Sequence, residues 1–195
     1  HRSDIVKAVL DVTDGIAVAG AHGKTSTTSM IGQILVEANA DPTVIIGGEV
    51  DYLKGSSCLG KGHFSVVEAD ESDGSFLKLH PHTIVITNIE DDHMDHYKTM
   101  ENLLNAFCQF VETLPVDGKA VVCGDNDNIR YVMSRVKRTF ITYGLEDNND
   151  YVAKNIHYVD SSLVYDVYHK GINISRISLR VPGEHNVLNS LAAFI

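Results

Sequence analysis

The sequence is poor in cysteine, and its three cysteines, Cys58, Cys108 and Cys123, lie far apart along the chain. An odd number of widely spaced cysteines favours neither a disulfide framework nor a zinc site. The chain also lacks a signal peptide at its start and any apolar run near the roughly 20 residues that a membrane-spanning helix needs. These absences predict a cytoplasmic protein, because thiols stay reduced there, with no membrane partner.

Basic residues are in the minority as well. The chain has 16 Lys and Arg against 26 Asp and Glu, a formal net charge of -10, and its basic residues are dispersed. Nucleic-acid backbones and anionic membranes attract clustered positive charge, so this distribution disfavours both as partners. Any anionic ligand must therefore be held locally. With 195 residues, 44% of them hydrophobic, the chain is long enough for one sizeable core.

Short apolar segments alternate with segments of helical character over most of the chain. The apolar segments are rich in β-branched residues and continuously apolar, which is typical of strands buried on both faces of a parallel sheet. The strands expected on this basis are GIAVAG, TVIIGG, FSVVEAD, TIVITNI, KAVVCG and FITYG. Helices are expected at residues 24–38, 100–114 and 128–136. This alternation predicts an α/β fold of the doubly wound P-loop type, with a mainly parallel sheet flanked by helices.

The pattern changes after Gly144, where apolar and polar residues alternate and Asp160-Ser161 and Lys170-Gly171 mark turns. A small antiparallel β meander is therefore expected near the C-terminus. The expected parts of the single domain 1–195 are a lead-in helix at 1–14, a parallel α/β core at 15–144, an antiparallel annex at 151–182 and the start of a further helix at 183–195. Both ends interrupt helical patterns, so we expect the sequence to be part of a longer protein.

The stretch GIAVAGAHGKTSTTSM runs from an expected strand through a loop into an expected helix. In phosphate-binding loops glycines let the backbone approach phosphate oxygens, a lysine reaches the β and γ phosphates, and a Ser or Thr hydroxyl binds Mg²⁺. The residues that fit these roles are Gly20, Gly23, Lys24 and Thr25. Val18 stands where the general pattern asks for a further glycine. The alternative is a plain glycine turn, which the flanking strand and helix disfavour.

Polar side chains follow two other expected strands. FSVVEADESD ends in Glu68, Asp70, Glu71 and Asp73. TIVITNIEDDHMDH ends in Asn88, Glu90, Asp91, Asp92, His93, Asp95 and His96. Because the carboxyl ends of parallel strands meet at one edge of a sheet, both groups are expected beside the glycine loop. A carboxylate there can hold the Mg²⁺ that bridges nucleotide phosphates, directly or through water.

Crowded acids and histidines at one sheet edge are costly unless a cation or proton chemistry compensates them. Two reactions fit. In a metal-dependent phosphohydrolase a His-Asp pair binds the metal that activates water, whereas a phosphoryl transfer uses a second divalent ion. Only the phosphoryl transfer also accounts for Lys24. A solvated acidic loop remains the alternative without function.

Four segments in this order resemble the ATP-binding central domain of the Mur ligases: residues 20–26, 68–73, 87–95 and 182–189. The family's phosphate loop has the shorter form Gly-x-x-Gly-Lys-Thr, so Val18 is no exception to it. The resemblance is greatest to the branch that adds L-alanine to UDP-N-acetylmuramate. It implies ATP and Mg²⁺ as cofactors, an N-terminal domain for the UDP portion and a C-terminal domain that helps to bind the amino acid. In the implied reaction ATP phosphorylates the substrate carboxylate, and the amine of L-alanine then attacks the acyl phosphate.

The resemblance also implies roles for single residues. Lys24 would stabilise the transferring phosphoryl group, Thr25 and Glu68 would hold one Mg²⁺, and His93 would bind a second near the acyl group. Lys24, Glu68 and His93 are thus the implied catalytic residues. The other residues implied to contact the nucleotide are Gly20, Ala21, His22, Gly23, Ser26, Asn88, His185, Asn186 and Asn189. Asn186 and Asn189 would recognise adenine through their side-chain amides. The alternative is that these two asparagines only cap a helix.

Three alternatives to this branch remain: a ligase that recycles murein tripeptide, a folylpolyglutamate synthase-like ligase, and a non-catalytic ATP-binding switch. The segment EADESDGSF favours the alanine-adding branch over the first two. A switch needs one magnesium site and no acyl acceptor, so the acids and histidines at 90–96 argue against it. Several relatives carry a carbamylated lysine after the Asp-His pair, and Lys98 is too close to His93 to be assigned that role.

Overall fold

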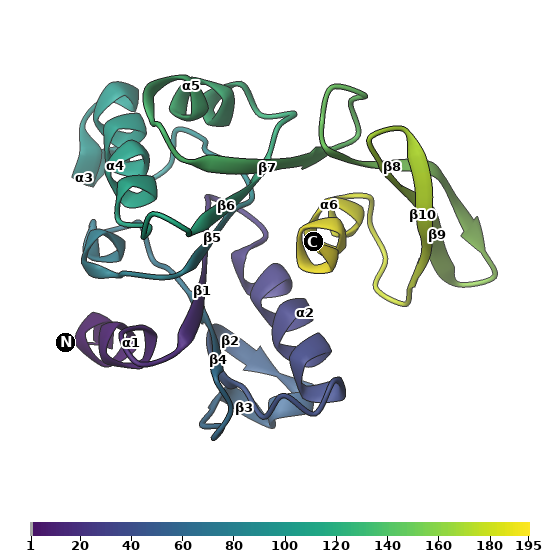
Figure 1. Ribbon diagram of the computed structural model, residues 1–195, viewed down its shortest axis with the longest axis horizontal. Helices are drawn as coiled ribbons and strands as arrows, with labels where there is room; N and C mark the ends of the chain where they lie inside the picture. The colour runs from purple at the N-terminus through teal and green to yellow at the C-terminus, as the bar shows by residue number, and fades with distance from the viewer. Residues whose placement is uncertain (1) are drawn as a thin grey trace.

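The computed structural model describes residues 2–195, which form one ten-stranded sheet with helices on both of its faces (Figure 1). The strand order is β10-β9-β8-β7-β6-β5-β1-β4-β2-β3. The parallel strands, in spatial order, are β7 (Thr139–Gly144), β6 (Lys119–Cys123), β5 (Thr83–Ile86), β1 (Asp14–Ala19), β4 (Phe64–Glu68) and β2 (Thr43–Val50). These are the six strands expected from the sequence, and the predicted α/β class is confirmed.

The central strands are buried on both faces, as their continuous apolar character requires. Val18 in β1 is fully buried, which explains why this position is apolar rather than a glycine of the loop. Val18 pairs with Glu68 of β4 on one side and with Val85 of β5 on the other. Strands β4 and β5 therefore end level with β1, and the polar segments that follow them begin beside the glycine loop.

Helices α2 (Lys24–Glu37) and α6 (His185–Phe194) lie on one face of the sheet, whereas α1 (Arg2–Leu10), α4 (Met100–Glu112) and α5 (Asp127–Arg135) lie on the other (Figure 1). Helix α4 buries an apolar stripe that includes Leu103, Phe107 and Phe110, spaced three and four residues apart. The lead-in helix expected at 1–14 is shorter, because it ends at Leu10 and β1 begins at Asp14. Residue 1 of that expected helix lies outside the described residues.

The expected meander consists of β8 (Tyr151–Val159), β9 (Ser162–His169) and β10 (Ile172–Leu179). Its two turns contain Asp160 and Lys170 with positive φ angles of 52° and 49°. Strand β8 pairs in parallel with β7, so the antiparallel strands continue the main sheet at one end instead of forming a separate layer. In Figure 1 this end curves away from the core.

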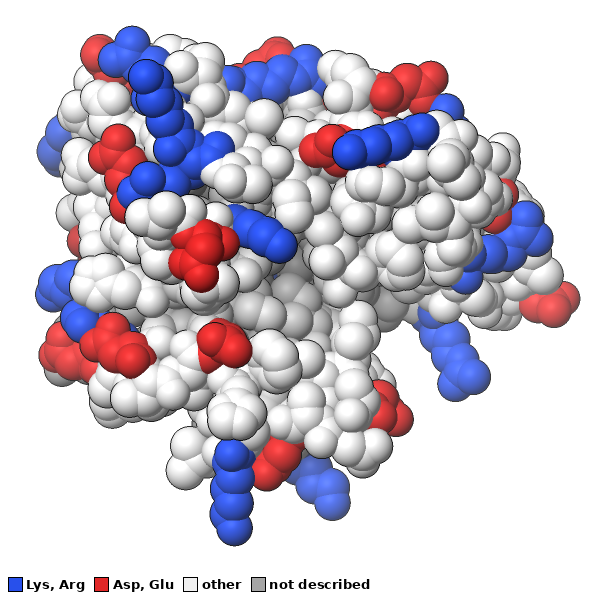
Figure 2. Space-filling view, in the orientation of Figure 1, with Lys and Arg blue, Asp and Glu red and all other residues white. Residues whose placement is uncertain are grey.

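Four short elements are absent from the sequence-based prediction. They are η1 (Asp51–Leu53), β3 (Gly55–Cys58), η2 (Ser75–Lys78) and α3 (Met94–Tyr97). Strand β3 pairs antiparallel with β2 at the sheet edge. No helix within residues 2–195 combines the length and apolar character needed to cross a membrane. Acidic and basic side chains are interspersed over the face shown in Figure 2.

Candidate functional site

The loop between β1 and α2 depends on two glycines with positive φ, Gly20 at 131° and Gly23 at 83°. A Cβ atom on Gly20 would collide with the Thr87 hydroxyl, and one on Gly23 would collide with the Asn189 amide oxygen. Helix α2 starts directly after Gly23, and no side chain caps it. Its first backbone N–H groups therefore need a partner from outside the helix, which makes this end suited to an anion.

Asn88, in the segment that follows β5, holds this loop. Its Oδ1 accepts a hydrogen bond from the His22 backbone N–H at 2.9 Å, and its Nδ2 donates to the His22 carbonyl at 2.9 Å. The Thr87 hydroxyl donates to the same carbonyl, and the Ala21 N–H donates to the Asn88 carbonyl at 3.3 Å. The His22 ring is exposed and lies 3.5 Å from Glu90. The structure thus places Asn88 beside the loop with its amide bonded to the loop backbone.

Lys24 is the first residue of α2, and its ammonium lies over the loop. Its Nζ donates to the carbonyls of Gly20 at 2.6 Å and Ala21 at 3.4 Å, and to Glu71 Oε1 at 2.8 Å. Glu71 is 2% exposed. The sequence placed this glutamate in an acidic strand end but did not single it out, because only the fold shows which of several neighbouring acids points inward.

Thr25 and Glu68 are brought together as the sequence predicted. The Thr25 hydroxyl lies 3.2 Å and 3.1 Å from the two carboxylate oxygens of Glu68, and the Gly47 N–H donates to Glu68 Oε2 at 2.7 Å. A hydroxyl and a carboxylate are the oxygen ligands that Mg²⁺ prefers. Within residues 2–195 no group of three or more His, Cys, Asp or Glu is arranged to hold a metal ion.

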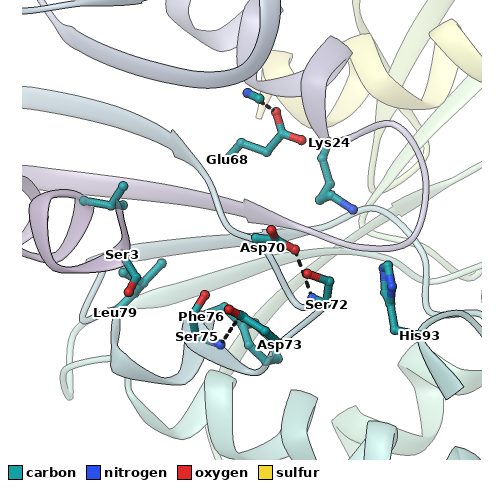
Figure 3. A pocket seen from close by; sticks show the side chains of 12 residues that line it. Ser3, Lys24, Glu68, Asp70, Ser72, Asp73, Ser75, Phe76, Leu79 and His93 are labelled. Atoms are coloured by element: carbon teal, nitrogen blue, oxygen red, sulfur yellow. Dashed lines mark hydrogen bonds between the residues drawn. The ribbon is translucent and has the colours of Figure 1, made fainter. Parts of the chain in front are cut away.

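His93 stands at the start of α3 in the left-handed region, with φ of 58°. Its Nε2 lies 3.6 Å from Glu71 Oε1 and 3.6 Å from Asp92 Oδ2. Glu68 ends β4, and Lys24 and His93 follow the adjacent strands β1 and β5 in the chain. All three residues line one cavity of about 370 Å³. Figure 3 shows the Lys24 ammonium and the His93 ring directed toward each other at one end of this cavity.

The opposite end of the cavity is formed by Val6 of α1, Phe76 of η2 and Leu79, which directly follows η2. Two carboxylates stand on the rim between the ends. Asp70 accepts from the Ser72 N–H at 2.9 Å, and Asp73 accepts from the Ser75 N–H at 2.9 Å (Figure 3). Hydrogen bonding from Ser75 lowers the pKa of Asp73. The cavity thus joins an apolar end to an end that carries a lysine, a histidine and carboxylates.

The C-terminal asparagines lie on the other side of the loop, outside this cavity. Asn186 Nδ2 donates to the Pro182 carbonyl at 2.7 Å, and Asn189 Nδ2 donates to Asn186 Oδ1 at 3.1 Å. The Thr27 hydroxyl donates to Asn189 Oδ1 at 3.3 Å, which ties α6 to α2. Both asparagine side chains are buried and bonded within the protein. Contact of either amide with adenine stays a prediction.

Two other predicted residues frame the loop and this turn. The His185 ring packs against Gly183, where a Cβ atom would meet the ring at 2.5 Å. Ser26 lies in the first turn of α2, directly after Thr25. The structure therefore brings the predicted lysine, glutamate and histidine to one cavity, with the predicted threonine hydrogen-bonded to the glutamate, and it places the asparagine motif behind the loop.

Comparison with known proteins identifies the family of this chain. The family model described as the Mur ligase middle domain matches residues 18–195. The UDP-N-acetylmuramate--L-alanine ligases of Pelotomaculum thermopropionicum and Syntrophotalea carbinolica are 45% and 42% identical to the chain over 99% and 98% of its length. The chain spans 42% of the length of each of these relatives.

Two solved structures share the fold closely. UDP-N-acetylmuramate:L-alanyl-gamma-D-glutamyl-meso-diaminopimelate ligase from Neisseria meningitides has a TM-score of 0.88 at 26% identity, covering 98% of this chain and 63% of that one. UDP-N-acetylmuramate-alanine ligase MurC from Thermotoga maritima has a TM-score of 0.86 at 28% identity, covering 99% and 42%. The resemblance seen in the sequence is thereby confirmed, and the chain belongs to the Mur ligase family as a middle domain.

Proposed function

We propose that this chain is the ATP-binding domain of a cytoplasmic ligase that joins L-alanine to UDP-N-acetylmuramate in peptidoglycan synthesis. The observation that carries the proposal is the convergence of Lys24, Glu68 and His93 on one cavity beside a glycine loop. Identities of 42% and 45% to L-alanine ligases support the choice of reaction. Free thiols at Cys58 and Cys123 fit the proposed location.

The loop is suited to the phosphates of ATP. Gly20 and Gly23 allow the positive φ angles of its backbone, and the uncapped first turn of α2 presents backbone N–H groups. Lys24 is already directed along the loop by the carbonyls of Gly20 and Ala21, so its charge stands where the terminal phosphates would lie. We infer that the loop binds the β and γ phosphates and that Lys24 stabilises the group in transfer.

The residues near the loop also fit Mg²⁺. The Thr25 hydroxyl and the Glu68 carboxylate are hydrogen-bonded to each other and would hold one ion whose other ligands are phosphate and water oxygens. His93 would hold a second ion at the end of the cavity. Bound there, Mg²⁺ supplies positive charge that lets two anions, a carboxylate and a polyphosphate, approach each other.

In the proposed reaction the acceptor carboxylate lies in the cavity near Lys24 and His93. One of its oxygens forms a bond to the terminal phosphorus of ATP while the bond to the ADP oxygen breaks. The amine of L-alanine then forms the amide bond, phosphate leaves with the former carboxylate oxygen, and the amine loses a proton. The residues described here serve the first step, because they surround the phosphate loop and one end of the cavity. Binding of L-alanine is assigned to a domain outside this chain.

A second candidate is a ligase that attaches a murein tripeptide instead of L-alanine. The Neisseria meningitides tripeptide ligase supports it, because its TM-score of 0.88 is as high as the 0.86 of the Thermotoga maritima enzyme. Fold similarity therefore does not separate the two substrates. Sequence identity above 40% to L-alanine ligases favours the single amino acid.

Phosphate release by the full-length protein tests the proposal. With ATP, Mg²⁺ and UDP-N-acetylmuramate present, addition of L-alanine is expected to start phosphate release and to form UDP-N-acetylmuramoyl-L-alanine, detected by mass spectrometry. The Lys24→Ala variant should bind a non-hydrolysable ATP analogue at least about 10-fold more weakly, since it loses a charge-assisted contact to phosphate. Reaction with the tripeptide but not with L-alanine would select the second candidate, and absence of both products would refute the ligase proposal.

A further inference from the structure

Glu71 is a buried carboxylate that touches two residues of the proposed site without lining the cavity itself. Its Oε1 accepts from Lys24 Nζ at 2.8 Å and lies 3.6 Å from His93 Nε2. Lys24 and His93 both face the cavity, whereas Glu71 is absent from its lining. Glu71 therefore stands behind the two residues and links the loop after β1 to the segment after β5.

The backbone of Glu71 is fixed in this position. Its carbonyl accepts hydrogen bonds from the Tyr97 hydroxyl and from the Gly74 N–H. Tyr97 is itself buried, and burial raises the pKa of its hydroxyl to about 12, so the hydroxyl remains a donor at neutral pH. The Glu71 backbone is thus held by the short helix α3 on one side and by its own turn on the other.

The hydrogen bonding of the Glu71 carboxylate is incomplete among the described residues. Its Oε2 is buried and has no hydrogen-bond partner within residues 2–195. A buried carboxylate is costly unless cations or donors compensate it, and Lys24 with His93 are the groups that reach it. Lys24 has three N–H donors, and Gly20, Ala21 and Glu71 take all three. A bound phosphate must therefore compete with Glu71 for the ammonium.

We propose that Glu71 is a positioning residue for phosphoryl transfer, whose single buried carboxylate sets the spacing between Lys24 and His93. The proposal rests on the function proposed above. Lys24 acts on the phosphate side of the cavity and His93 on the acceptor side, so their spacing determines whether the terminal phosphate and the acceptor carboxylate meet in line. A displacement of about 1 Å at such a site can lower the rate about 100-fold.

Removal of this carboxylate should separate catalysis from nucleotide binding. Without the Glu71 carboxylate, the phosphates of ATP no longer compete with an anion for the Lys24 ammonium. ATP should therefore bind to the variant as tightly as to the wild type, or more tightly. The rate should fall because Lys24 and His93 lose their common anchor. For Glu71→Gln, which keeps the side-chain size, we expect kcat to fall about 10- to 100-fold, corresponding to the loss of the charge-assisted hydrogen bond with Lys24.

The experiment compares the full-length wild type, Glu71→Gln and Glu112→Gln, in which the same change removes an exposed carboxylate on α4. Phosphate release gives kcat and KM for ATP, and calorimetry with a non-hydrolysable ATP analogue and Mg²⁺ gives the Kd. Lower kcat with an unchanged or smaller Kd in Glu71→Gln alone supports the proposal. An unchanged kcat, or a parallel loss of kcat and ATP binding, overturns it.

A second variant covers the case in which Glu71→Gln does not fold, as judged by its thermal unfolding. Tyr97→Phe removes the hydroxyl that fixes the Glu71 backbone and keeps the carboxylate. We expect a several-fold lower kcat with an unchanged Kd for the ATP analogue, and an unchanged kcat would overturn the proposal. Inactive wild-type protein would instead refute the proposed function, so the two failures are distinguishable.

Discussion

The segments after β4 and β5 carry similar densities of acidic residues but place them differently. At the end of β4 and just after it, Glu68 and Glu71 turn inward and bond to Thr25 and Lys24 at the start of α2. The acids after β5, Glu90, Asp91, Asp92 and Asp95, are exposed. From that segment Asn88 holds the loop backbone and His93 faces the cavity. Acidic composition at a strand end therefore indicates the location of a site, whereas burial identifies the side chains that form it.

The largest expected effect concerns His93, which lies among exposed acids yet faces the cavity. His93→Ala in the full-length protein should reduce L-alanine-dependent phosphate release about 100-fold or more, because it removes the proposed ligand of the second Mg²⁺. Binding of an ATP analogue, measured by calorimetry, should change less than about 3-fold. Asp91→Asn is the matched control from the same exposed loop, and its kcat should equal that of the wild type. Equal losses of phosphate release in His93→Ala and Asp91→Asn would show that His93 matters no more to the reaction than its exposed neighbours.

A smaller effect is expected for Glu68, on the inward-facing side of the comparison. Glu68→Ala should weaken Mg²⁺-dependent binding of the ATP analogue about 10-fold, because Thr25 alone would remain at the proposed first metal position. Titrations with and without Mg²⁺ measure this effect. If Glu68→Ala weakens binding of the ATP analogue equally with and without Mg²⁺, Glu68 acts on the loop and not through a cation.

The smallest effect concerns the pH dependence of stability at Tyr97, which is buried although it follows the exposed acids. Burial raises its pKa from 10.0 to about 12 in the folded chain. The stability that this raised pKa contributes to the folded state is therefore fully present below pH 10 and is lost as the pH rises through 12. Between pH 9 and pH 11 the wild type should lose about 1 kcal/mol more free energy of unfolding than Tyr97→Phe. Urea unfolding at both pH values measures the difference, and parallel losses would contradict the assigned shift.

Much of the fold was predictable because local pattern and burial agree. Val18, Val67 and Ile84 lie in continuous apolar runs and are fully buried in the sheet centre. Strand β3 was missed because its sequence, GSSC, has no β-branched or aromatic residue that would distinguish an edge strand from a loop. Helix α3 has only four residues, which is too short to show a helical period.

The candidate site was predictable in its residue types more than in its contacts. Lys24, Thr25 and Glu68 follow from a loop pattern and from the rule that parallel strands end at one edge. Glu71 could not be singled out from the sequence, because the inward direction of its side chain depends on a turn held by Tyr97. The amides of Asn88 and Asn186 are bonded to backbone carbonyls, a partner choice that no spacing in the sequence reveals.

The glycine loop makes contacts that are distant in sequence, and these bear on how the chain folds. His22 bonds to Asn88, which is 66 positions away, and Thr27 bonds to Asn189, which is 162 positions away. Contacts of such separation form late, because the entropy of closing long loops opposes them. We expect the loop to reach its final shape only after β5 and α6 have docked. A nascent or truncated chain that lacks α6 would then have a folded centre before it has a nucleotide site, and nucleotide binding would report the completion of folding.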